Sequence, residues 1–189
     1  MTLNRSFPLA ALGLLLGASL AQAAAPAQPK LIRRGAYLVS IAGCHDCHTP
    51  LKMGPKGPEP DMTRMLSGHP DSLKMPPAPK LPEGPWGWAG SLTMTAFTGP
   101  WGVSYSANLT PDKETGLGSW TEAQFLQMVR TRRHLGQGRP ILPPMPVQNL
   151  QLVSEPDLKA IFAYLQSIPA VHNRVPVPIE PAATPIPMH

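Results

Sequence analysis

The sequence predicts an all-α fold in which long, irregular connections join the helices of a small core. Three segments support this prediction, because their apolar residues recur at the spacing of a buried helix face. The 26 prolines gather elsewhere, mainly between residues 50 and 100 and after residue 169, where they disfavour regular helix. The composition therefore separates helical segments from proline-rich connections.

The first 23 residues have the pattern of a cleavable secretory signal peptide. Arg5 precedes an apolar run over residues 9–20, and Ala21-Gln22-Ala23 matches a cleavage site. We expect export to the periplasm and no transmembrane segment in the mature chain, because no later apolar run is long enough to span a bilayer. Retention of the signal peptide as a membrane anchor is the alternative.

The first predicted helix begins near Lys30 and ends at Gly43. Gly35 lies in its apolar stripe although glycine weakens a helix, which predicts that another helix approaches closely there. The stripe as a whole consists of Leu31, Gly35, Leu38, Ile41 and Ala42.

Both cysteines of the chain occur in the motif Cys44-His45-Asp46-Cys47-His48, directly after this helix. C-x-x-C-H is the pattern of covalent haem attachment, in which two thiols form thioethers with the haem vinyl groups and the histidine binds the iron. We therefore expect one haem c and its iron at Cys44, Cys47 and His48. The other ring nitrogen of His48 should donate to a carbonyl in the proline-rich stretch that follows.

Two other uses of a C-x-x-C pair remain open. A zinc site needs four ligands, and the chain has no second cysteine pair, while ligands crowded into five residues would hardly form a tetrahedron. A thioredoxin-like dithiol would be accompanied by a βαβ pattern, which is not visible here.

Residues 49–106 show little periodicity and contain many proline, glycine and methionine residues. A plain loop of this length is uncommon, so we interpret the segment as an irregular insertion that covers the haem, with short strands around residues 91–97. Four of its aromatic residues are expected to pack on the haem edge or against each other, namely Trp86, Trp88, Trp101 and Tyr105.

Two further helices follow the insertion. A capping box of Ser119 and Glu122 predicts the start of the second, and Ser154 with Asp157 predicts the start of the third. Pro169 ends the third helix, so a domain over residues 24–170 would be followed by an extended or mobile proline-rich tail, residues 171–189. The expected buried positions are Phe125, Leu126, Val129, Leu158, Ile161, Phe162, Leu165 and Ile168.

Met145 is the strongest candidate for the sixth ligand of the iron. It lies in Pro143-Pro144-Met145-Pro146, where the prolines restrict the conformations that the thioether must give up on binding. A methionine ligand favours Fe(II) and a high reduction potential. An open or water-bound iron is also possible, and the competing side chains are Met53, Met62, Met65, Met75, Met94 and His134.

Three landmarks in order resemble class I c-type cytochromes: C-H-D-C-H, then A-N-L-T-P-D at residues 107–112, then P-P-M-P at residues 143–146. More narrowly, they resemble the cytochrome c domains in haem subunits of periplasmic dehydrogenases, over about residues 30–170. The resemblance implies a cytochrome c fold whose first and last helices cross around one haem. It also implies thioethers at Cys44 and Cys47, with His48 and Met145 as axial ligands. The single C-x-x-C-H motif and the long insertion depart from the family pattern.

The resemblance implies an electron carrier rather than an enzyme, moving single electrons between a periplasmic dehydrogenase and a terminal oxidase or another cytochrome. The net charge of +5 favours an acidic partner, and no basic stripe interleaved with aromatic residues supports nucleic-acid binding. The alternative is a haem enzyme or ligand-binding haem protein with an open sixth coordination site. A third interpretation is a dedicated subunit whose 49–106 insertion binds one partner enzyme.

Overall fold

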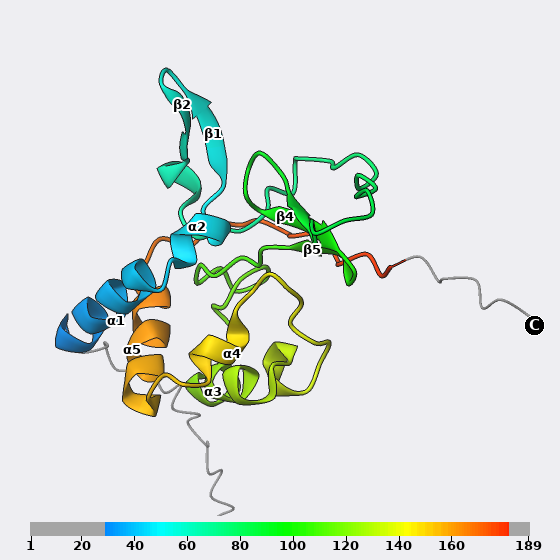
Figure 1. Cartoon of the computed structure of the whole chain (residues 1–189). Helices are drawn as coiled ribbons and strands as arrows, with labels where there is room; N and C mark the ends of the chain where they lie inside the picture. The colour runs from blue at the N-terminus through cyan, green and yellow to red at the C-terminus, as the bar shows by residue number, and fades with distance from the viewer. Residues whose placement is uncertain (1–28, 182–189) are drawn as a thin grey trace, which may run out of the picture.

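A computed structural model describes residues 29–181, so the predicted signal peptide lies outside the described residues. Figure 1 shows α1 and α5 side by side, α3 and α4 below the centre, and strands above them. Within residues 29–181, no helix is both long and apolar enough to cross a bilayer. The helices are α1 (Pro29–Ile41), α2 (Cys44–His48), α3 (Glu122–Thr131), α4 (Val147–Leu150) and α5 (Glu155–Leu165), with short 3-10 turns at Met62–Arg64 and His134–Gly136.

The contact between α1 and α5 depends on Gly35, as its place in the apolar stripe predicts. A Cβ atom at this position would lie only 1.9 Å from the Ala160 carbonyl oxygen and 2.7 Å from the Tyr164 Cβ. Val39, next along this face, is fully buried, whereas Ile41 was expected to be buried and is 62% exposed. The two helix backbones therefore touch without an intervening side chain.

A bidentate ion pair also joins these helices. Arg34 Nε and Nη2 donate to the two carboxylate oxygens of Asp157 at 2.9 and 3.1 Å. Asp157 stands in the first turn of α5, which Ser154 caps by accepting from the Asp157 N–H. The carboxylate of Asp157 thus links α5 to α1, while its backbone N–H donates to the Ser154 hydroxyl of the cap.

Helix α3 completes the core through Phe125 and Val129, and the Phe125 ring lies 5.2 Å from that of Phe162 on α5. Its capping box consists of Thr121 and Gln124, each bonding the other's backbone N–H. The prediction of Ser119 and Glu122 placed this box two residues too early. Both pairs fit the S/T-x-x-E/Q pattern, so the pattern alone does not select between them.

The prediction of an all-α fold is wrong, because the 49–106 insertion forms two small antiparallel sheets. One is a hairpin of β1 (Leu51–Gly54) and β2 (Gly57–Pro60), which projects away from the helices in Figure 1. The other has the order β3 (Ala89–Gly90), β4 (Ala96–Gly99) and β5 (Gly102–Tyr105).

Turn chemistry and β-branched residues explain these strands. A tight turn that pairs Gly99 with Gly102 connects β4 to β5, and Gly102 has a φ of +89°, which glycine tolerates. Thr98 and Val103 pair directly across the two strands, and β-branched side chains suit such positions. The prolines that disfavour helix in this segment are compatible with β2, because β2 belongs to a two-stranded sheet and is therefore an edge strand.

The C-terminal segment, defined here as residues 171–181, runs extended across the other elements. Asn173 is fully buried in it and forms hydrogen bonds with residues 64–71, which follow the C-x-x-C-H motif in the chain. Its Nδ2 donates to the carbonyls of Ser67 and His69 at 2.7 and 2.9 Å. Its Oδ1 accepts from Arg64 Nη2 at 2.7 Å and from the Asp71 N–H at 2.9 Å.

We predict that Asn173→Ala lowers the free energy of unfolding by about 2–4 kcal/mol, because it leaves several buried polar groups without a partner. Urea denaturation monitored by circular dichroism measures this change. Asn149→Ala is the matched control, since Asn149 is exposed on α4, and it should stay within about 0.5 kcal/mol of the wild type. Equal effects of the two substitutions would contradict the role given to Asn173.

His69 is buried within the insertion beside Tyr105 of β5, and its environment makes stability depend on pH. Nε2 donates to the Leu73 carbonyl at 3.1 Å, so the neutral ring accepts at Nδ1 from Thr95 Oγ1, 2.9 Å away. Burial lowers the pKa of His69 from its ordinary value. At a pH below that ordinary value the unfolded chain therefore binds the proton first, and the folded state loses stability.

We predict that the free energy of unfolding falls as the pH decreases through about 6.5, the ordinary pKa of histidine, and that His69→Gln flattens this slope. Glutamine can still donate to the Leu73 carbonyl but does not titrate. Urea denaturation at several values between about pH 5 and 8 measures the slope. An unchanged slope in the variant would assign the pH dependence to other groups.

Candidate cofactor site

Helix α2 consists of the motif Cys44-His45-Asp46-Cys47-His48 and nothing else. Gly43 separates it from α1 in a left-handed conformation, with φ of +66°, which glycine adopts without steric cost. Both cysteines are free thiols and half-buried, and Cys44 packs against the main hydrophobic cluster. One short turn therefore presents two thiols and an imidazole at fixed spacing.

The environment of the two thiols keeps them protonated. Burial raises the pKa of Cys44 to about 11, and it also raises the pKa of Cys47. Within residues 29–181, no group of three or more His, Cys, Asp or Glu side chains is arranged to hold a metal ion.

His48 is buried, and its ring is oriented by the chain itself. The distance from Nδ1 to the Ala107 carbonyl oxygen is 2.8 Å, and because a carbonyl only accepts, Nδ1 carries the proton. Burial lowers the pKa of His48, which favours the neutral imidazole. Nε2 then holds a lone pair, and it forms no hydrogen bond to the described residues. A neutral imidazole fixed in this way suits an axial haem ligand.

The acceptor of this hydrogen bond lies farther along the chain than expected. Ala107 is 59 residues from His48 and begins the A-N-L-T-P-D landmark, just beyond the proline-rich stretch that was expected to supply the carbonyl. Asn108 fixes the landmark by donating to the Val171 carbonyl at 2.8 Å. The landmark was recognised in the sequence, but its role in orienting His48 was missed.

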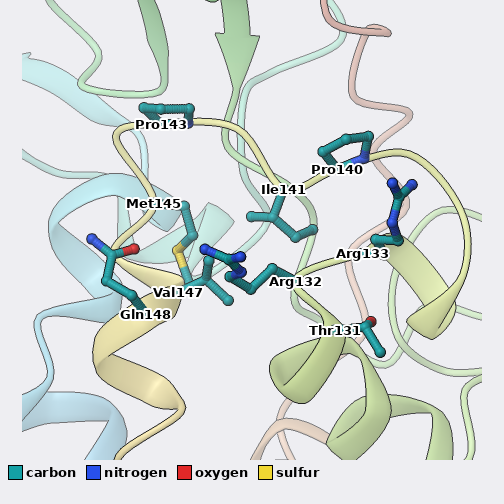
Figure 2. Close-up of a pocket in the computed structure, with 9 residues that line it drawn as sticks. All are labelled: Thr131, Arg132, Arg133, Pro140, Ile141, Pro143, Met145, Val147 and Gln148. Carbon is teal, nitrogen blue, oxygen red and sulfur yellow. The ribbon is translucent and has the colours of Figure 1, made fainter.

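Met145 lies in the connection between α3 and α4, within residues 142–146, which we call the Met145 loop. Its side chain lines a cavity of about 360 Å³. Figure 2 shows the Arg132 side chain reaching from the end of α3 toward the Met145 thioether. None of the residues that line this cavity belongs to α2. The lining residues are Thr131, Arg132, Arg133, Pro140, Ile141, Pro143, Met145, Val147 and Gln148.

The competing ligands occupy other environments. Met53 on β1 is 76% exposed and Met62 is 58% exposed, whereas Met65 packs against the hydrophobic cluster. Met94 has a left-handed backbone, and the His134 ring lies edge-on to Trp120 with 5.0 Å between centroids. Burial lowers the pKa of His134.

The aromatic residues of the insertion do not form one cluster. Trp86 is 73% exposed, while Trp88 lies edge-on to Phe97 with ring centroids 5.9 Å apart. The Tyr105 ring is tilted by 50° against that of His69, with centroids 4.9 Å apart, and Trp101 Nε1 donates to Ser104 Oγ. Among the described residues no two of these four rings pair with each other, and packing on the haem edge, the other half of the expectation, stays a prediction.

Comparison with known proteins gives relatives of one kind over most of the chain. The cytochrome c subunit of a quinone-dependent alcohol dehydrogenase from Gluconacetobacter polyoxogenes is 30% identical over 162 residues, 86% of this chain. The gluconate 2-dehydrogenase cytochrome c subunit of Pantoea cypripedii is 30% identical over 80% of the chain. The cytochrome subunit of a fructose dehydrogenase from Gluconobacter japonicus is 26% identical over 72% of the chain.

These relatives are much longer proteins. The matches cover 27%, 25% and 21% of the alcohol, gluconate and fructose dehydrogenase subunits, respectively, so the chain spans about a quarter of their length. No family model matches the chain.

Proposed function

We propose that this chain, a homologue of the cytochrome c subunits of alcohol and gluconate dehydrogenases, carries single electrons through one covalently attached haem. The homology confirms the resemblance predicted from the three sequence landmarks. The observation that carries the proposal is the geometry of α2. Two free thiols stand one helical turn apart beside an imidazole whose Nδ1 is held by the Ala107 carbonyl at 2.8 Å.

Each residue of the proposed site has a separate task. Cys44 and Cys47 would hold the haem through thioethers, His48 would bind the iron through Nε2, and Met145 would bind from the opposite side. The haem iron would supply the one-electron Fe(III)/Fe(II) couple. The protein orients the imidazole, restricts the Met145 loop and provides apolar surroundings, since Cys44 packs against the buried cluster. A His/Met pair makes electron transfer the natural use of such a site.

The proposed partners are proteins rather than small substrates. The relatives are named as subunits of alcohol, gluconate and fructose dehydrogenases, so we propose a dehydrogenase as the electron donor. A terminal oxidase or another cytochrome would accept the electron. The predicted signal peptide supports export to the periplasm, where a haem on C-x-x-C-H would be attached. In this role the chain itself makes and breaks no substrate bond.

A haem protein with an open sixth coordination site is the alternative. One observation favours it, because the cavity beside Met145 is not lined by any residue of α2. Exposing the dithionite-reduced wild-type protein to carbon monoxide separates the two functions. We expect slow or no change in the absorption spectrum at neutral pH, because Met145 must first leave the iron. Rapid, complete formation of a carbon monoxide complex would contradict the His/Met carrier and support the alternative.

A further inference from the structure

Strand β5, which lies beside the Met145 loop, is hydrogen-bonded along both of its edges. It pairs with β4 on one side, and on the other the Val103 N–H and carbonyl exchange hydrogen bonds with those of Ile179 at 2.8 and 2.9 Å. In Figure 1 the C-terminal segment runs next to β5. A strand held on both sides moves less than an edge strand, so a side chain from β5 has a defined position.

Ser104 on β5 is 6% exposed and connects this strand to the Met145 loop. Its hydroxyl donates to the Pro143 carbonyl oxygen at 2.6 Å and accepts from the Trp101 Nε1–H at 3.2 Å. Both directions are fixed, because an indole N–H only donates and a carbonyl only accepts. The two hydrogen bonds therefore form a relay from Trp101 through Ser104 to Pro143, in which each bond polarises the next.

The Met145 loop forms few other hydrogen bonds that could fix its position. Pro143, Pro144 and Pro146 lack an N–H, so the loop presents carbonyls and almost no backbone donors. Among the hydrogen bonds of the described residues, the one from Ser104 alone connects residues 142–146 to a distant part of the chain. The other bonds of these residues run to Val147 and Asn149, immediately after the loop.

We propose that Ser104 is a positioning residue that keeps the Met145 loop closed, so that the insertion, through β5, controls how readily the thioether leaves the iron. This inference rests on the proposed function, in which Met145 binds the iron. The same stretch of chain serves the other axial ligand, because the Ala107 carbonyl, three residues after Ser104, accepts from His48 Nδ1. One segment of four residues would thus position both ligands.

Binding of imidazole to the oxidised protein tests this role, because an external ligand enters only after Met145 has left the iron. We expect Ser104→Ala to bind imidazole about five- to tenfold faster than the wild type, the scale of one lost hydrogen bond. Ser104→Thr keeps the hydroxyl and should restore the wild-type rate. Trp101→Phe removes the indole donor together with part of the ring, leaves the Ser104 hydroxyl in place, and should give a smaller acceleration.

Ser106→Ala is the matched control. Ser106 lies two residues along the same segment, is 8% exposed, and its hydroxyl makes no hydrogen bond to the described residues. Thermal unfolding of all variants separates loop opening from loss of stability, since a merely structural role would change the melting temperature without changing imidazole entry.

The outcomes distinguish this inference from the proposed function. If Met145→Ala accelerates imidazole binding and Ser104→Ala binds at the rate of Ser106→Ala, the positioning role is refuted and the ligation stands. If the wild type already binds imidazole as fast as Met145→Ala, the proposed ligation fails, and the inference fails with it. A selective acceleration in Ser104→Ala, rescued by Ser104→Thr, supports the relay.

Discussion

Gly35→Ala is expected to destabilise the protein by about 3 kcal/mol or more, although alanine normally stabilises a helix relative to glycine by about 1 kcal/mol. The added Cβ would lie 1.9 Å from the Ala160 carbonyl oxygen and 2.6 Å from its carbon, both backbone atoms that cannot rotate away. Helices α1 and α5 must separate, and buried contacts of Val39 are lost with them. Thermal unfolding should show a decrease of roughly 6–12 °C in a domain of this size.

Gly87→Ala provides the control for this prediction. A Cβ at Gly87 would meet no atom within 4 Å, and its φ lies outside the left-handed region. The melting temperature of this variant should remain close to the wild-type value. A Gly35→Ala variant as stable as Gly87→Ala would show that α1 and α5 are not packed with their backbones in contact.

Met145→Ala is expected to lower the reduction potential strongly and to open the sixth coordination site. A thioether ligand stabilises Fe(II), and alanine offers no atom that could bind in its place. The weak absorption band of methionine-bound ferric haem near the red end of the visible spectrum should disappear, and carbon monoxide should bind the reduced variant rapidly. Redox titration and optical spectroscopy measure these changes.

Met53→Ala is the matched control, because Met53 competes for the same role in sequence but is 76% exposed on β1. Its potential and spectrum should equal those of the wild type. Loss of the band in Met53→Ala, with an unchanged spectrum in Met145→Ala, would transfer the ligand role to the β1–β2 hairpin.

The sequence predicted the three long helices because each carries a local signal. Gly35 indicated the helix contact, and Ser154 marked the start of α5, since glycine and cap residues act within a few positions of themselves. The C-x-x-C-H motif is equally local, and the chain is similar to cytochrome c subunits of dehydrogenases over most of its length. Local patterns therefore indicated both the helical part of the fold and the centre of the candidate site.

The strands of the insertion and the hydrogen bonds that hold the candidate site depend on contacts between residues far apart in the sequence. The strands of the insertion pair through backbone groups, and prolines in β2 concealed the hairpin because they are compatible with both loops and edge strands. Ala107 meets His48 across 59 residues, and Ser104 meets Pro143 across 39. Neither residue type marks its own partner, so only the folded chain reveals how the proposed axial ligands are held.

The mass of the purified, exported protein after acid–acetone extraction shows whether one haem is covalently attached through Cys44 and Cys47. We predict that the polypeptide keeps its haem and has the mass of the mature chain plus one haem. The pyridine haemochrome spectrum should show both vinyl groups saturated. A colourless polypeptide with the mass of the mature chain alone, and haem recovered in the extract, would show that Cys44 and Cys47 do not form thioethers with haem.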